Sequence, residues 1–159
     1  MDSLLSQHRG LLSPAEEGEY VNLLVAAREE PADEEGNAPA LPLRLAILHL
    51  KLQLLVRDSS EEVNSFTIGG QSLWFSPALR ANLRNAIDAL EAASEQTVSF
   101  HGITLPIADA KAALTAIELY AAKCSNVTEQ HKANIEELGS IADVNRYDIT
   151  VGYPAKLVF

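Results

Sequence analysis

Apolar and polar positions alternate most regularly in residues 66–133, where one arrangement occurs twice. The first copy reads FTIGGQSLWFSPALRANLRNAIDAL, and the second reads VSFHGITLPIADAKAALTAIELYAAKC. Each copy contains an alternating apolar run, a glycine turn, a second short apolar run, a proline and then apolar positions at helical spacing. Because an internal repeat sets the architecture, we expect two β-hairpin–helix units, over residues 66–95 and 97–133.

The two copies match position by position. The matching pairs are Phe66 and Val98, Thr67 and Ser99, Ile68 and Phe100, Gly70 and Gly102, Leu73 and Leu105, and Phe75 and Ile107. Alternation places every second residue on the same face of a strand, and glycine supplies the positive φ of a tight hairpin turn. We therefore predict an α+β, predominantly helical fold, in which two hairpins form a small antiparallel sheet packed on helices.

Helix start signals mark the elements on either side of the repeat. Ser13 with Pro14 and Glu16 forms a capping box, which predicts a helix to about residue 28. A long helix should follow Pro106 and end at Gly139 as its C′ residue. Ser140 should cap a short final turn, whereas residues 1–12 indicate only a weak helical turn or disorder.

The leucine-rich run of residues 41–56 fits two patterns. Its first half alternates as a strand would, but the abundance of leucine and scarcity of β-branched residues favour a helix. Apolar residues on several sides of that helix predict that it is buried between other elements or in a subunit interface. His49 lies within it without a second ligand at metal-binding spacing, so we expect a core or boundary histidine.

These elements suggest a division of the chain near residue 40. Residues 30–40 are acidic and rich in Pro, Ala and Gly, which is typical of an exposed linker. We expect residues 1–40 to form an N-terminal helical arm with this linker. Residues 41–159 should form a single α+β domain that contains the repeat and a C-terminal tail. The apolar end of that tail should pack as a strand or lid.

Composition narrows the kinds of partner. The chain has 159 residues and a formal net charge of −10, which disfavours nucleic acids and anionic membranes because both require clustered Lys and Arg. The apolar run of residues 41–56 falls short of the ~20 residues that a spanning helix needs. The N-terminus lacks the basic and apolar regions of a signal peptide. We therefore expect a protein that is not secreted by a signal peptide and that has no membrane or nucleic-acid partner.

The search for reaction chemistry identifies no catalytic, cofactor-binding or metal-ligating residue. The turn at Gly69 and Gly70 lacks the lysine and spacing of a phosphate-binding loop. His101, Tyr120 and His131 have no catalytic companions at a recognisable spacing. The single cysteine, Cys124, lies on an apolar helical stripe and is expected to be a buried hydrophobe. We predict that the protein is not an enzyme and uses no cofactor.

Several short motifs occur in a distinctive order along the chain: Val63-Asn64-Ser65-Phe66 with Gly70 and Leu73-Trp74, Leu105-Pro106-Ile107, Glu118-Leu119-Tyr120-Ala121, Cys124-Ser125-Asn126-Val127-Thr128, His131-Lys132, and Tyr147-Asp148 with Gly152-Tyr153-Pro154. This ordered set resembles a domain family of unknown function from bacteriophages and prophages that is common in gut Bacteroides-type genomes. The resemblance covers about residues 43–159. Relatives occur in or beside phage tail and tail-fibre proteins, and the ending is similar to that of tail-fibre assembly proteins.

This resemblance implies a non-enzymatic tail-associated structural component or tail-fibre assembly factor, located in the bacterial cytoplasm or the virion. Its partners would be other phage tail proteins or further copies of itself. Trp74, Tyr153 and Phe159 are the candidate partner contacts, because aromatic anchors dominate interface energetics. Trp74 also fits a place in the core of the first hairpin. The family has no assigned catalytic residues to transfer.

Two other hypotheses remain open. The first is a small ligand-binding module or enzyme with a site between the two repeat units. A polar pocket holding His101 or His131 beside an acidic residue would indicate the enzyme. The second is a self-associating scaffold, in which the helix of residues 41–56 and the alanine-rich helix after Pro106 pack across a symmetry axis.

Overall fold

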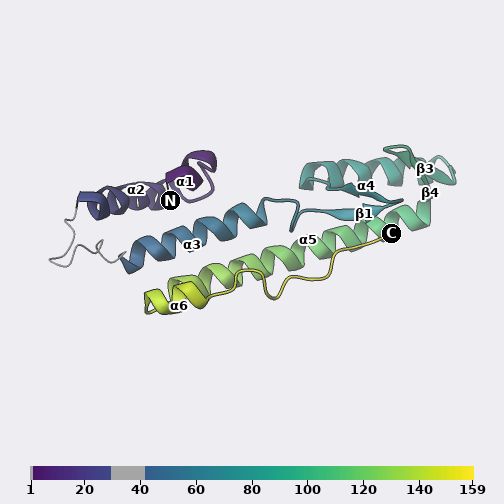
Figure 1. The fold of residues 1–159 in the computed structure, drawn as a ribbon. Coiled ribbons are helices and arrows are strands. Elements are labelled where there is room, and N and C mark those ends of the chain that lie inside the picture. Colours follow the sequence, from purple (N-terminus) through teal and green to yellow (C-terminus); the bar gives the residue numbers. More distant parts are fainter. Residues whose placement is uncertain (1, 30–41) are drawn as a thin grey trace. The chain divides into compact units, whose positions relative to one another are not determined.

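A computed structural model describes residues 2–29 and 42–159 of the chain (Figure 1). Its elements, in chain order, are α1 (Asp2–Gln7), α2 (Pro14–Glu29), α3 (Leu43–Asp58), β1 (Phe66–Ile68), β2 (Gln71–Leu73), α4 (Pro77–Ala92), β3 (Thr97–Phe100), β4 (Ile103–Pro106), α5 (Ile107–Glu136) and α6 (Ile141–Arg146). Helices predominate and the strands are antiparallel hairpins packed on them, which confirms the predicted α+β, mainly helical fold.

The predicted single small sheet is instead two separate sheets of two strands each. β1 pairs only with β2, and β3 pairs only with β4, in the strand ladders that the structure describes. Each hairpin is closed by its own two-residue turn, between Ile68 and Gln71 and between Phe100 and Ile103. Apolar side chains rather than a shared ladder connect the two hairpins.

Both turns have the backbone conformation that the repeat predicts. Gly69 and Gly70 have φ of 55° and 79°, and His101 and Gly102 have φ of 48° and 77°. Positive φ at both central residues is the requirement of a type I′ turn, whose twist matches that of the flanking strands. Histidine is among the few residues enriched at positive φ. His101 can therefore occupy the first position of the second turn, where the first copy has a glycine.

The chain folds as two compact units. Unit 1 comprises Met1–Ser60 and Val127–Gly152, and unit 2 comprises Glu61–Asn126 and Tyr153–Phe159. α5 therefore contributes residues to both units. The expected boundary between residues 40 and 41 and the acidic linker of residues 30–40 lie outside the residues that the structure describes.

In unit 1, α3 is buried on two faces. One face carries Leu45, Leu48 and Leu52, which pack with apolar residues of the N-terminal helices, including the fully buried Tyr20. The other face carries Ala46, Ile47, Leu50 and Leu54, which pack with Ile135 of α5 and Val144 of α6. This arrangement confirms that the leucine-rich helix is buried between other elements. It also makes α1 and α2 part of the core of unit 1.

Helix ends follow the predicted caps with one exception. The Ser13 N–H donates to Glu16 Oε2 over 3.0 Å and the Glu16 N–H donates to Ser13 Oγ over 3.3 Å, so the capping box forms. Ser140 likewise caps α6, accepting from the Asp143 N–H. α5 ends at Glu136, however, before Gly139, which does not adopt positive φ. Bonds spanning three residues, such as Leu138 N–H to Ile135 O at 3.3 Å, close its last turn instead.

In unit 2, α4 and α5 supply the helical part of the core. α4 begins at Pro77 behind a Ser76 cap, and its buried Ile87 packs with Ile107, Ala110 and Leu114 of α5. Phe66, Phe75 and Ile117 form a second buried cluster. A third contains Val63, Tyr120 and Cys124, in which the Tyr120 hydroxyl donates to the Val63 carbonyl over 2.8 Å. Cys124 is buried, as its position on the apolar stripe predicts.

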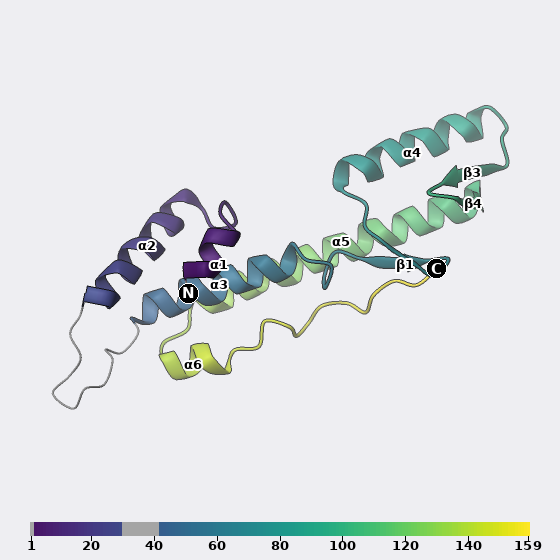
Figure 2. The ribbon, with the colours of Figure 1, turned by 45° about the horizontal axis from the view of Figure 1, so that its top comes forward.

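The C-terminal tail returns to β1 as an additional extended strand. The Thr67 N–H donates to the Leu157 carbonyl over 2.9 Å, and the Phe159 N–H donates to the Thr67 carbonyl over 2.8 Å. These bonds form a parallel bridge between Thr67 and Val158. In both ribbon views the tail ends beside β1 (Figure 1; Figure 2). The expectation that the tail packs as a strand is confirmed.

None of the helices within residues 2–29 and 42–159 combines the length and the apolar character needed to cross a membrane.

Candidate functional site

Unit 2 contains an apolar cavity of about 60 Å³ that is partly open to solvent. Its wall is formed by side chains from both hairpins and both helices of the unit. The lining residues are Phe66, Ile68, Leu73, Phe75, Leu83, Ile87, Val98, Phe100, Ile103, Leu105, Ala110, Ala113, Leu114 and Ile117. Every one of these side chains is a hydrocarbon, so the cavity offers a ligand dispersion contacts and almost no hydrogen bonds.

The internal repeat accounts for this wall. Three of the pairs that match between the copies contribute both of their members: Phe66 and Val98, Ile68 and Phe100, and Leu73 and Leu105. Alternate residues of a strand share a face, so the apolar positions of each hairpin lie on one side. The two apolar faces enclose the cavity together with α4 and α5. The sequence pattern indicates these faces but not the space left between them.

Aromatic rings fix one part of the wall. Phe75 meets Phe66 edge to face at 4.8 Å between ring centroids, and it meets Phe100 in the same way at 5.1 Å. Such pairs are among the favoured aromatic geometries. A charged group placed among these rings would lose its hydration without compensation. The wall therefore selects for uncharged, apolar groups.

The two histidines of the enzyme hypothesis do not line this cavity. His101 lies exposed in its turn, with its ring centroid 4.3 Å from that of Phe100. His131 is buried in unit 1, with Nδ1 2.8 Å from the Tyr147 hydroxyl and Nε2 2.9 Å from the Val151 carbonyl. Since a carbonyl only accepts, Nε2 carries the proton in that contact. His131 thus has a structural role, holding the segment after α6.

The three predicted partner contacts all lie in unit 2, and two of them are half-buried. The Trp74 ring lies 6.5 Å from that of Phe66 and 6.2 Å from that of Tyr120. Tyr153 packs on the cluster that contains Tyr120. Phe159 is 43% exposed and lies edge-on to Phe66 at 6.0 Å. Trp74 therefore contributes to the aromatic core of the first hairpin, and Phe159 presents the most open ring of the three.

The tail strand is also an open sheet edge. In a parallel ladder one residue bonds to the two neighbours of the residue opposite. Because Thr67 bonds to Leu157 and Phe159, the N–H and C=O of Val158 point away from β1. The Val158 side chain is 76% exposed. This edge is formed by Val158 and Phe159 and is called the tail edge below. The sequence did not predict a backbone-binding site here. The sequence feature that could have indicated it is the apolar run at the end of the tail.

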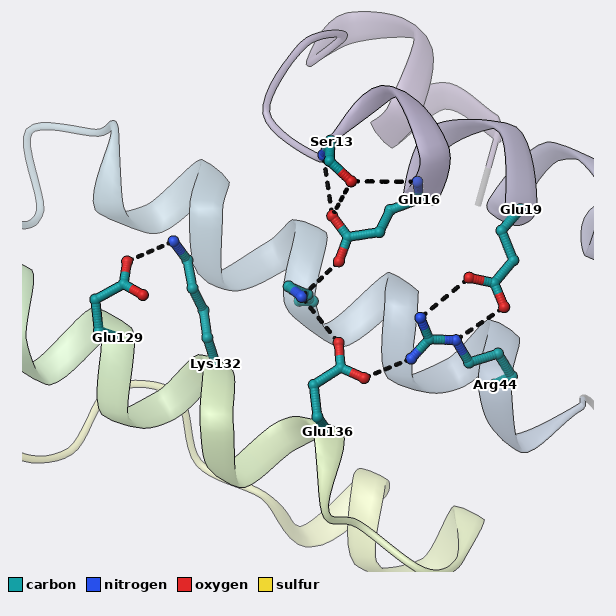
Figure 3. Close-up of polar contacts among 8 residues, drawn as sticks. Ser13, Glu16, Glu19, Arg44, Glu129, Lys132 and Glu136 are labelled. Carbon is teal, nitrogen blue, oxygen red and sulfur yellow. Dashed lines mark hydrogen bonds and ion pairs between the residues drawn. The ribbon is translucent and has the colours of Figure 1, made fainter.

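Unit 1 carries a network of five charged side chains that joins α2, α3 and the end of α5 (Figure 3). Lys51 Nζ lies 2.5 Å from Glu16 Oε1 and 2.8 Å from Glu136 Oε1. Arg44 donates to both carboxylate oxygens of Glu19 at 3.0 Å and to Glu136 Oε2 at 2.5 Å. Each cation thus bridges two carboxylates, and Glu136 is shared between them. This geometry satisfies every charge in the network and favours a structural role.

Burial and hydrogen bonding act in opposite directions on these carboxyls. Burial raises the pKa of Glu16, but hydrogen bonds from Lys51 and Ser13 outweigh it and lower the pKa to about 2. Burial also raises the pKa of Glu136, and the hydrogen bonds from Lys51 and Arg44 reverse that effect and lower it. Both carboxylates are therefore ionised across the neutral and mildly acidic range.

Within residues 2–29 and 42–159, His, Cys, Asp and Glu side chains form no group of three or more that could hold a metal ion. No protein family, curated protein or solved structure matches the chain.

Proposed function

We propose that this protein is a non-enzymatic, phage-derived protein that acts through protein–protein contacts, as a tail-associated structural component or a tail-fibre assembly factor. The observation that supports contact with another protein is the tail edge. It combines outward backbone donor and acceptor groups at Val158 with two exposed apolar side chains. The phage assignment rests on the resemblance of the sequence motifs.

The tail edge suits recognition by strand addition. An exposed strand edge is a template for an extended segment of another chain, whose backbone completes the ladder and whose side chains supply specificity. Val158 would pair through its backbone, and Phe159 would provide an aromatic contact beside it. The neighbouring bonds to Thr67 keep the edge extended before a partner arrives, which reduces the entropy lost on binding.

Strand addition is tested by replacing Val158 with proline. Proline removes the outward N–H but leaves both bonds to Thr67, which use the Leu157 carbonyl and the Phe159 N–H. The matched control is Val158→Thr, which keeps the N–H and the β-branched shape. In a phage or prophage that carries the gene, we expect deletion and Val158→Pro to give particles without tail fibres. Wild-type protein and Val158→Thr should restore them.

The readouts are electron microscopy of purified particles, plaque titre and mass spectrometry of virion proteins. Detection of the protein in purified virions would indicate a structural component, whereas its absence from complete particles would indicate an assembly factor. Normal fibres and titre in the deletion strain would contradict the phage role. Full complementation by Val158→Pro would contradict strand addition alone.

A second candidate is the self-associating scaffold, now with a different surface. α3 is enclosed within unit 1, so it no longer offers the proposed contact. α5 still exposes Leu119, at 56%, with Ala112 and Ala122 on the same side of the helix. Light scattering of the wild-type protein and the Leu119→Glu variant tests this candidate. A wild-type oligomer that is dissociated by Leu119→Glu would support it, whereas a monomeric wild-type protein would exclude it.

A further inference from the structure

We propose that the cavity of unit 2 is a binding site for an uncharged apolar group of a few carbon atoms, such as the end of an alkyl chain. Val158 and Phe159 of the tail edge do not line this cavity, and the proposal goes beyond a role in protein–protein contact. It rests on the size of the cavity, the chemistry of its wall and the exposure of the side chains at its margin.

The volume suits a small hydrocarbon group. The cavity measures about 60 Å³, several times the ~10–15 Å³ that one water molecule requires. Water would find almost no polar partners there, and apolar cavities in proteins stay dry and take up small apolar molecules. An engineered apolar cavity that binds benzene is larger, at about 150 Å³. A group of a few carbons therefore matches the space better than a ring.

Burial of the lining residues indicates how such a group would enter. Phe66, Ile87 and Ile117 are almost fully buried, with exposed fractions of 1%, 4% and 2%. Ile103 and Ala113 are only half-buried. The buried residues form the inner wall and the half-buried ones the margin that is open to solvent. An alkyl end would insert between hairpin β3–β4 and α5, leaving any polar part of the molecule in water.

The chain contains its own reporter for this event. Trp74 is the single tryptophan, and its ring lies 6.5 Å from Phe66, which lines the cavity. A ligand that contacts Phe66 should change the environment of Trp74 and therefore its fluorescence. Binding to the native state alone must also raise the melting temperature.

The test compares 1-hexanol with 1,6-hexanediol on the full-length protein. Both have six carbons, but only 1-hexanol can bury one end without burying a hydroxyl group. We expect 1-hexanol to change Trp74 emission along a saturable curve. At tenfold excess over Kd it should raise the melting temperature by roughly 3–6 °C. The diol should do neither. An equal response to both alcohols, or no saturable response to 1-hexanol, would overturn the proposal.

Two alanines on successive positions of α5 provide matched variants. Ala113→Leu places three extra carbons at the cavity margin, whereas Ala112→Leu adds the same atoms on the exposed side of the helix. We expect Ala113→Leu to weaken 1-hexanol binding at least tenfold and Ala112→Leu to leave it unchanged. Equal binding by the two folded variants would place the ligand elsewhere and overturn the proposal.

A third variant keeps the test decisive if Ala113→Leu does not fold. Leu83→Ala enlarges the cavity from the α4 side at a half-buried position. The enlarged cavity should bind 1-octanol more tightly than wild type does, by severalfold, since each buried methylene contributes about 0.8 kcal/mol. Unchanged affinity for 1-octanol would count against this cavity as the site.

Discussion

At the scale of single residues, Lys51 shows how local charge determines the response of unit 1 to acid. Its ammonium group bridges Glu16 on α2 and Glu136 on α5. Both carboxyl pKa values are lower in the folded protein than their ordinary value of 4.5. A lowered folded pKa means that the unfolded state binds more protons, so stability falls as the pH falls. The contribution is complete above about pH 4.5 and is lost progressively towards pH 2.

We predict that Lys51→Met reduces stability at neutral pH and weakens its dependence on acid. The variant removes the cation that lowers both carboxyl pKa values and leaves the carboxylates partly desolvated. The expected loss is ~1–2 kcal/mol at pH 7, after allowance for solvent screening of partly exposed charges. Urea denaturation at several pH values between 2.5 and 7 measures both effects.

Lys132→Met is the matched control for that substitution. Lys132 pairs with Glu129 within α5 (Figure 3), and the Glu129 side chain is 66% exposed. An exposed pair of this kind contributes ~0–0.5 kcal/mol. Equal losses in the two variants, or an unchanged acid dependence in Lys51→Met, would show that the network does not shift the carboxyl pKa values as described.

At the scale of elements, two glycines have different backbone conformations, because one lies in a helix and the other in a hairpin turn. Gly18 lies within α2, is exposed, and has open space where a methyl group would be added. Gly70 occupies the turn of the first hairpin with φ of 79° and also has open space. Sterics are therefore equal, and only the backbone conformation differs. The effect of alanine should change sign between the two sites.

We predict that Gly18→Ala stabilises the protein by ~0.5–1 kcal/mol, because alanine has the higher helix propensity and reduces the entropy of the unfolded chain. Gly70→Ala should destabilise it by ~1–2 kcal/mol, because an L residue is strained at positive φ. Gly70→Asn should cost less than alanine. Chemical denaturation of the three variants measures the differences, and the same sign for both alanine variants would contradict the assigned conformations.

At the scale of the whole molecule, the N-terminal segment belongs to a core. Leu45, Leu48 and Leu52 of α3 are completely buried, and their neighbours include Tyr20 and Leu12 from the first 29 residues. Residues 1–40 were expected to form a helical arm with a linker. The helices α1 and α2 of this segment pack on α3 and contribute to the core of unit 1.

We predict that deletion of residues 1–40 causes self-association or partial unfolding, because it exposes the leucine face of α3 to water. Size-exclusion chromatography with light scattering, together with circular dichroism, measures the outcome. A full-length control with Val21→Ser and Val25→Ser changes only the exposed face of α2 and should remain unaffected. A monomeric truncated protein with unchanged stability would contradict the packing role.

Much of the fold was predictable from local sequence signals. The repeat predicted both hairpins, and the glycines at 70 and 102 lie in their turns. The Ser13 capping box located the start of α2. Such signals are local: alternation, caps and turn residues act over two to seven positions, so the sequence reveals them directly. The predicted end of α5 at Gly139 was wrong, because backbone hydrogen bonds close the last turn of the helix without a terminal glycine.

The sites depended on contacts that no local pattern records. Alternation identified the apolar faces of the hairpins, but whether they join in one sheet, fill their common space or leave a cavity depends on side-chain volumes across distant segments. The tail edge arises because Val158 returns to Thr67 from far along the chain. By itself the sequence determined which elements form and which faces are apolar. Only the tertiary structure decided which faces meet and where they remain open, because packing is a property of pairs of surfaces.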